Sequence, residues 1–156
     1  MKEMIRRNSN WRMGLPILFS AIYLIPSMLM TTLWINLQSV HVSDAPSALA
    51  AQAEVSRSIY FGFYGNYNVS VREADTDTQI CSVTANPFNY KGGLSGTVKK
   101  SLAWWVDGEA KVLDCKARGF HSGRFYITTC HNVLFPAPYV LARRCVRSND
   151  FWIGDE

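Results

Sequence analysis

The chain has 156 residues, of which 48% are apolar and 13% aromatic, and its formal net charge is +4. This length suits one domain with a short appendage, and the composition excludes collagen-like, coiled-coil and intrinsically disordered chains. The modest net charge does not by itself indicate nucleic-acid binding. The distribution of the charges along the chain is more informative than their sum.

The N-terminal segment predicts a membrane anchor. Residues 1–12 carry a local net charge of +3 and are expected to be a basic cytoplasmic N-terminus. Residues 13–35 contain no charged side chain, and at about 1.5 Å per residue they can cross a hydrocarbon core of about 30 Å. Trp11 and Trp34 bracket this stretch, as aromatic residues do at membrane interfaces. We therefore expect a single transmembrane signal-anchor helix, in a bacterial inner membrane with the remainder in the periplasm.

A cleaved signal peptide is the alternative interpretation of this segment. Such peptides have an apolar core of about 7–15 residues, followed closely by a cleavage site of the A-x-A kind. Ala48-Leu49-Ala50 is such a tripeptide, but it lies well beyond the end of the apolar stretch, which is itself too long. The sequence therefore favours a retained anchor.

Residues 36–57 are predicted to form an extracytoplasmic juxtamembrane linker with a short helix. Asp44 followed by Pro46 is typical of a helix N-terminus, because Asp caps the first amide groups and Pro fits the first turn. The Ala-rich segment from Ala48 to Arg57 is expected to be that helix.

Residues 58–156 predict a small β-rich extracytoplasmic domain. Short segments of β-branched and aromatic residues are separated by turn residues, a pattern typical of an antiparallel sandwich or barrel. Residues 44–156 carry 12 basic and 11 acidic side chains, and this near neutrality argues against a nucleic-acid partner. An Asp107-Gly108 hairpin is expected between the third and fourth strands. The expected strands are residues 67–71, 78–84, 97–106, 110–115, 124–130 and 139–146.

All four cysteines belong to the β-rich domain and are predicted to form two disulfides. A small domain outside the cytoplasm gains about 2–4 kcal/mol from each disulfide. We prefer Cys115–Cys130 with Cys81–Cys145, because Cys115 and Cys130 end what are expected to be neighbouring strands, and Cys130–Cys145 is nearly as plausible. No pair of ligands has the spacing typical of a zinc site. No metal, cofactor or catalytic site is predicted.

One motif resembles the sortase family of membrane-anchored cysteine transpeptidases. Ile127-Thr128-Thr129-Cys130, with Arg143 following, is similar to the Thr-Leu-x-Thr-Cys signature and the arginine of the next strand. The resemblance implies a β-barrel with Cys130 as nucleophile and Arg143 as its oxyanion partner. The family's catalytic histidine lies tens of residues upstream of the cysteine, whereas His121 is only nine residues before it. A cysteine nucleophile needs a base or cation to hold its thiolate.

The layout of the chain also resembles type IV pilins and pseudopilins. These structural subunits have a short basic leader, a glycine at the cleavage point, a long apolar helix and a β-sheet with a disulfide loop near the C-terminus. The resemblance implies processing after Gly14 and a Cys130–Cys145 loop. The chain departs from the family at the fifth mature position, where Phe19 replaces a glutamate.

Surplus aromatic residues give the best indication of binding. Trp104 and Trp105 are adjacent, so on a strand one of them must leave the main core. Two irregular segments, 86–93 and 131–138, also carry aromatic residues beside proline. Such surfaces serve protein partners, or they lie at a membrane interface or under a linker. The residues predicted to bind a partner are Trp104, Trp105, Phe88, Tyr90 and Phe135.

Together these features predict a single-pass membrane protein whose periplasmic β-rich domain binds a protein partner without catalysis. The partner would be an envelope component, or a target that an inhibitor or immunity-type factor meets there. A pilin-like subunit and a sortase-like enzyme are the alternatives.

Overall fold

The computed structural model of the chain describes residues 18, 34–134 and 139–154. The predicted membrane span at residues 13–35 lies outside this part of the chain, apart from Leu18, Trp34 and Ile35. Among the described residues, no helix is long and apolar enough to cross a membrane.

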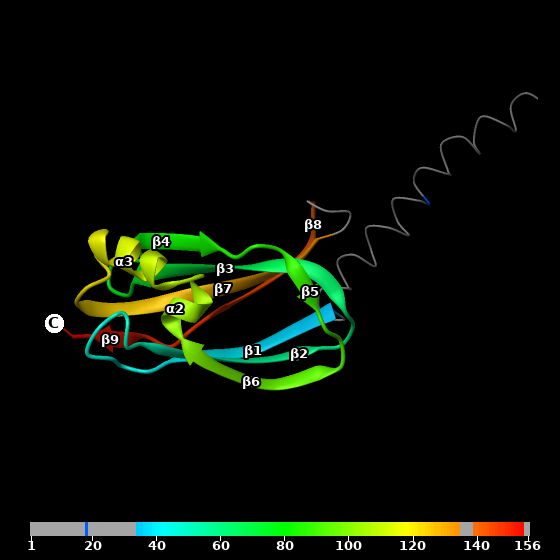
Figure 1. The fold of residues 1–156 in the computed structure, drawn as a ribbon, viewed down its shortest axis with the longest axis horizontal. Helices are drawn as coiled ribbons and strands as arrows, with labels where there is room; N and C mark the ends of the chain where they lie inside the picture. Colours follow the sequence, from blue (N-terminus) through cyan, green and yellow to red (C-terminus); the bar gives the residue numbers. More distant parts are fainter. Residues whose placement is uncertain (1–17, 19–33, 135–138, 155–156) are drawn as a thin grey trace, which may run out of the picture.

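The described part is a mainly-β antiparallel sandwich of two sheets (Figure 1). One sheet has three strands in the order β1-β2-β6. The other has six, with the order β4-β3-β7-β8, and the short strands β5 and β9 pair with β3 and β7. The element bounds are β1 Ile35–Val42, β2 Gln52–Ile59, β3 Phe63–Glu73, β4 Gln79–Thr84, β5 Phe88–Tyr90, β6 Leu94–Ser101, α2 Leu102–Trp105, α3 Glu109–Ala117, β7 Gly123–Leu134, β8 Val140–Arg147 and β9 Phe151–Ile153.

The alternation of side chains along the central strands produces the core. In β3, Tyr67, Val69 and Val71 are buried between the sheets, whereas Asn68 belongs to the outer face. Ile127 of β7 lies opposite Val71 and is also buried. The prediction of strands at 67–71, 78–84, 124–130 and 139–146 is confirmed, because this period-two pattern matches a sheet with one apolar face.

The helix predicted from Ala48 to Arg57 is wrong. Gln52–Ile59 is strand β2, paired with β1 on one side and β6 on the other. Its Ala53 and Val55 are buried while Glu54 between them is more exposed, and this alternation outweighs the helical preference of alanine. Asp44 does not cap a helix there, because its carboxylate accepts a hydrogen bond from the amide of Trp152.

The strand predicted at residues 110–115 is also wrong, since this segment forms α3. Asp107 and Gly108 both have positive φ, 65° and 120°, as a hairpin turn would require. Here they instead connect α2 to α3. The segment after them, Glu-Ala-Lys-Val-Leu-Asp-Cys-Lys-Ala, consists largely of good helix formers, and Val112 and Cys115 are buried one turn apart on one side.

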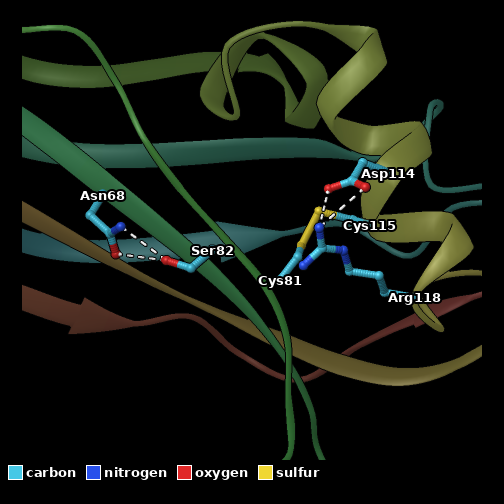
Figure 2. The surroundings of a disulfide bond; sticks show 6 residues. All are labelled: Asn68, Cys81, Ser82, Asp114, Cys115 and Arg118. Atoms are coloured by element: carbon cyan, nitrogen blue, oxygen red, sulfur yellow. Dashed lines mark hydrogen bonds and ion pairs between the residues drawn. A yellow bond between two sulfur atoms is a disulfide. The ribbon is translucent and has the colours of Figure 1, made fainter.

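Two disulfides are present, Cys81–Cys115 and Cys130–Cys145. The first joins β4 to α3, beside the exposed Asp114–Arg118 ion pair (Figure 2). The second joins residues that lie opposite each other in β7 and β8. The preferred pairing is wrong because Cys115 belongs to a helix over β4 and not to a strand beside β7, while the alternative Cys130–Cys145 is confirmed.

Candidate functional site

The main candidate site is a hollow of about 710 Å³ at the side of the sandwich, between α2 and β5. We call it the aromatic hollow. Its wall combines three aromatic side chains with a cation, two carboxylates and an amide. The residues that define it are Arg57, Tyr67, Asn86, Phe88, Trp104, Asp107 and Glu109.

Helix α2 separates the two adjacent tryptophans. Ser101 caps this helix by accepting a hydrogen bond from the amide of Trp104. Trp105 is 2% exposed and its indole nitrogen donates to the carbonyl of Ala53, 3.2 Å away. Trp104 is 48% exposed and lies edge-on to Trp105, with ring centroids 4.8 Å apart. One tryptophan therefore fixes the helix in the core while the other lines the hollow.

Strand β5 contributes Phe88, which is 38% exposed, to the opposite wall. It pairs with Gly65 of β3 and stacks on Tyr90, at a centroid distance of 4.3 Å. Gly65 cannot carry a side chain, because a Cβ there would lie 2.2 Å from the carbonyl oxygen of Asn132 in β7. Phe88 also contacts Tyr67 edge-on, at 6.1 Å.

Charges of both signs border the aromatic hollow. Arg57 lies over the ring of Tyr90, 5.8 Å from its centroid, and none of the described carboxylates is within salt-bridge distance of it. Burial lowers the pKa of Arg57, which nevertheless stays charged at any physiological pH. Burial, and then the negative charge of Asp107, raise the pKa of the Tyr67 phenol. The site therefore offers hydrogen-bond donors within it and carboxylates at Asp107 and Glu109.

Beneath the hollow, Tyr90 and His131 form a buried pair. The Tyr90 hydroxyl and His131 Nδ1 are 2.8 Å apart, and His131 Nε2 has no hydrogen-bond partner. Burial, reinforced by the charge of Arg57, lowers the pKa of His131 to about 3. Burial raises the pKa of Tyr90. Both groups are therefore neutral at physiological pH, and their position in the core indicates a structural role.

A second hollow, of about 720 Å³, lies on the outer face of the six-stranded sheet. Its surface is mainly polar, with side chains such as Asn68, whose amide donates to the hydroxyls of Ser82 and Thr84. Cys130 and Arg143, the residues of the sortase-like hypothesis, both line it. Cys130 is in a disulfide and offers no thiolate, so the arrangement lacks the nucleophile that this chemistry requires.

The structure brings two of the five predicted binding residues to the aromatic hollow, Trp104 and Phe88. Trp105 and Tyr90 are buried beneath it, and Phe135 lies outside the described residues. In the described part of the chain, no group of three or more histidine, cysteine or acidic residues could hold a metal ion.

Sequence reasoning misses Arg57, Tyr67 and Asp107 as site residues. The sequence pattern places Arg57 in a linker helix, and Asp107 in a hairpin turn. Tyr67 belongs to a correctly predicted strand, but only the pairing of β3 with β5 and β7 places it beside Phe88 and above His131. A strand assignment for residues 52–59 would have put Arg57 in the sandwich.

No family model matches the chain, and no curated protein sequence matches it. Among solved structures, the chain is similar to a β-glucosidase from Kluyveromyces marxianus, with a TM-score of 0.28 and 9% sequence identity. This similarity covers 76% of the present chain and 15% of the enzyme's chain.

Proposed function

We propose that the protein is a single-pass, membrane-anchored binding protein of the bacterial inner membrane, with its β-sandwich in the periplasm. The apolar stretch at residues 13–35, preceded by basic residues, supports the anchor and its orientation. Two disulfides in a domain of this size support an oxidising compartment. The sandwich starts at Ile35, the last residue of that stretch, whereas the pilin resemblance implies a helix that continues beyond the membrane. The layout therefore favours an anchored domain over a pilin-like subunit.

The aromatic hollow is the proposed binding site for a protein partner. The observation that carries this proposal is that Trp104 and Phe88, from different elements of the fold, are both exposed and line one hollow. Partly exposed aromatic residues around a concavity are typical of the anchoring positions of protein interfaces. The hollow would take an apolar side chain of the partner, and Asp107 and Glu109 would pair with a basic residue next to it.

Photocrosslinking of the full chain in its native membrane tests this proposal. A photoreactive phenylalanine analogue replaces Trp104 in one variant and Trp152 in another. Trp152 is the matched control, since it is 55% exposed and does not line the aromatic hollow. We expect one discrete protein adduct from position 104 and none from position 152. The adduct at position 104 should disappear when full-length chain without the photoreactive analogue is present in excess.

Substitution separates binding from folding. Trp104→Ala should weaken partner capture while the far-UV spectrum and the melting temperature stay close to those of the wild type. Trp152→Ala should leave capture unchanged. If both variants capture the partner as well as the wild type, the hollow is not the binding site. A mature N-terminus beginning at Leu15, measured by mass spectrometry, would instead support the pilin-like alternative.

A further inference from the structure

One end of the sandwich carries an unusual concentration of exposed apolar side chains. We call it the proximal end, because Trp34, near the end of the predicted anchor, and the start of β1 lie there. Its large apolar side chains have between 41% and 71% of their surface exposed. They are Tyr60, Phe61, Tyr64, Leu94, Tyr139 and Val140.

Backbone pairing places these residues together. The amide of Tyr60 donates to the carbonyl of Trp34, and the amide of Gly93 donates to the carbonyl of Tyr60. Leu94 pairs with Ile59 at the same end of β2. In the other sheet, β5 and the start of β8 reach the same end of the molecule (Figure 1). The Phe61 ring packs edge-on against Trp34, with centroids 6.3 Å apart.

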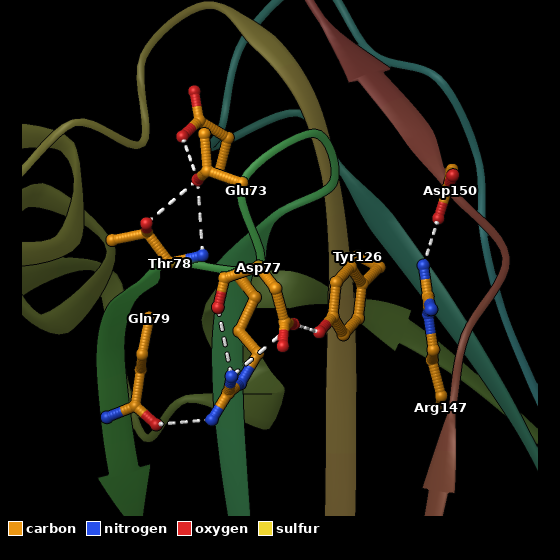
Figure 3. Close-up of polar contacts among 9 residues, drawn as sticks. Glu73, Asp77, Thr78, Gln79, Tyr126, Arg147 and Asp150 are labelled. Atoms are coloured by element: carbon orange, nitrogen blue, oxygen red, sulfur yellow. Dashed lines mark hydrogen bonds and ion pairs between the residues drawn. The ribbon is translucent and has the colours of Figure 1, made fainter.

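The segments that form the proximal end carry few charged side chains. Residues 34–37, 58–66, 88–96 and 139–142 include no aspartate or glutamate, and their one charged side chain is Lys91. Arg143 and Arg144 follow directly in β8. The acidic side chains of the described residues belong to other segments. At the opposite end of the sandwich, which we call the distal end (Figure 1), Glu73 ends β3 and Asp77 follows it before β4. Arginines accompany the carboxylates there, since Arg72 pairs with Asp77 and Arg147 pairs with Asp150 (Figure 3).

We propose that the proximal end rests on the bilayer, with its aromatic and aliphatic side chains in the interfacial zone and Lys91 against anionic lipid headgroups. Tyrosine and tryptophan favour this zone, because their rings are apolar and their polar groups reach water. Anionic headgroups attract lysine and arginine and repel carboxylates. An end whose segments hold one lysine and no carboxylate therefore fits contact with an anionic surface.

This inference rests on the proposed anchor, since the anchor would hold the proximal end against the bilayer. The distance along the chain is short, because the predicted span at residues 13–35 ends where β1 begins. A domain attached so closely has its first strand and the loops around it within reach of the headgroups. The distal end, with Trp152 in β9, is then the part most remote from the lipid.

Photocrosslinking to lipid tests this orientation in the full chain. The chain is reconstituted in vesicles of phosphatidylethanolamine and phosphatidylglycerol, with the photoreactive phenylalanine analogue at position 61, 139 or 152. We expect lipid adducts by mass spectrometry at positions 61 and 139 and only background at the distal position 152. Equal adduct yields at all three positions would overturn the proposal. Adducts at position 61 to a second copy of the chain would also overturn it, because this end would then be a protein interface.

The charge of Lys91 provides a second, independent measurement. Lys91→Glu should lower the lipid adduct yield at position 61 several-fold in vesicles containing phosphatidylglycerol. Lys111→Glu in α3 is the matched control, since this exposed lysine belongs to a helix away from the proximal end, and it should leave the yield unchanged. If both substitutions lower the yield equally, the proposed contact between Lys91 and the lipid headgroups is contradicted.

Extraction with alkaline carbonate separates this inference from the proposed anchor. A chain that stays in the bilayer but gives no lipid adduct at position 61 contradicts the orientation alone. A chain that leaves the bilayer contradicts both the anchor and the orientation.

Discussion

Two clusters of polar side chains differ in how the protein accommodates them. Tyr90 and His131 are buried together between the sheets, with Trp105 nearby in the same core. At the distal end, the exposed Asp77 carboxylate pairs with Arg72 and accepts a hydrogen bond from the Tyr126 hydroxyl (Figure 3). In the buried cluster a polar group without a partner is costly, because no water can replace the missing partner. At the surface water replaces a lost contact, so we expect the two clusters to respond very differently to substitution and to pH.

The largest expected effect is on the buried side, at Trp105. Trp105→Ala removes a fully buried indole and leaves the carbonyl of Ala53 without its donor, so the free energy of unfolding should fall by about 3–5 kcal/mol. Trp104→Ala, one residue away but exposed, should change it far less. Chemical denaturation monitored by circular dichroism measures both. Equal losses for the two variants would contradict the separation of a core tryptophan from an exposed one.

The disulfides sharpen the same comparison, because Cys81–Cys115 is buried and Cys145 is exposed. Replacing both Cys81 and Cys115 by serine should lower the free energy of unfolding by about 2–4 kcal/mol. The two cysteines are 34 positions apart in the sequence, against 15 for Cys130–Cys145, so the second pair should contribute less on the loop-entropy argument. Denaturation under non-reducing conditions compares the two double variants. A larger loss from the Cys130–Cys145 pair would contradict this order.

The acid response of His131 is the next expected effect. Its pKa is about 3 when folded, against about 6.5 when unfolded, so between these values the unfolded chain binds a proton that the folded chain does not. Stability should therefore fall as the pH falls through this window, by about 1.4 kcal/mol per pH unit. The neighbouring groups give no compensating negative charge, since they are Tyr90, Tyr67 and the cation Arg57.

Two histidine substitutions test this slope. His131→Phe should flatten the dependence of unfolding free energy on pH between 6.5 and 3, whereas His121→Gln, at an exposed loop position, should not. Unfolding midpoints across this pH range provide the measurement. The idea fails if the His131 variant retains the full wild-type slope.

How far the sequence predicts this molecule depends on the range of the interactions involved. The alternation at 67–71 is local, so it predicts β3 and the face on which Tyr67 lies. The Tyr90–His131 pair joins residues 41 positions apart, and it depends on the pairing of β3 with both β5 and β7. The Asp107-Gly108 turn suits a hairpin as well as a helix connection, and the helix formers after it, together with the packing of Val112 and Cys115, select the helix. Because the packing of distant segments is not visible in the local sequence, the sequence predicts an aromatic binding surface but does not predict that Arg57 belongs to it.

The smallest expected effect is at the surface, in the network around Asp77. The hydrogen bond from Tyr126, together with Arg72, holds the pKa of the Asp77 carboxyl below its usual range. This carboxylate therefore contributes stability above the usual pKa of an aspartate, and the contribution is lost as the pH falls through its lowered folded value. Asp77→Asn should lower the unfolding midpoint slightly at pH 7, with the difference from the wild type vanishing in acid and shrinking in high salt. A loss as large as that of Trp105→Ala, or one insensitive to salt, would show that this surface network supports the fold as strongly as the buried cluster does.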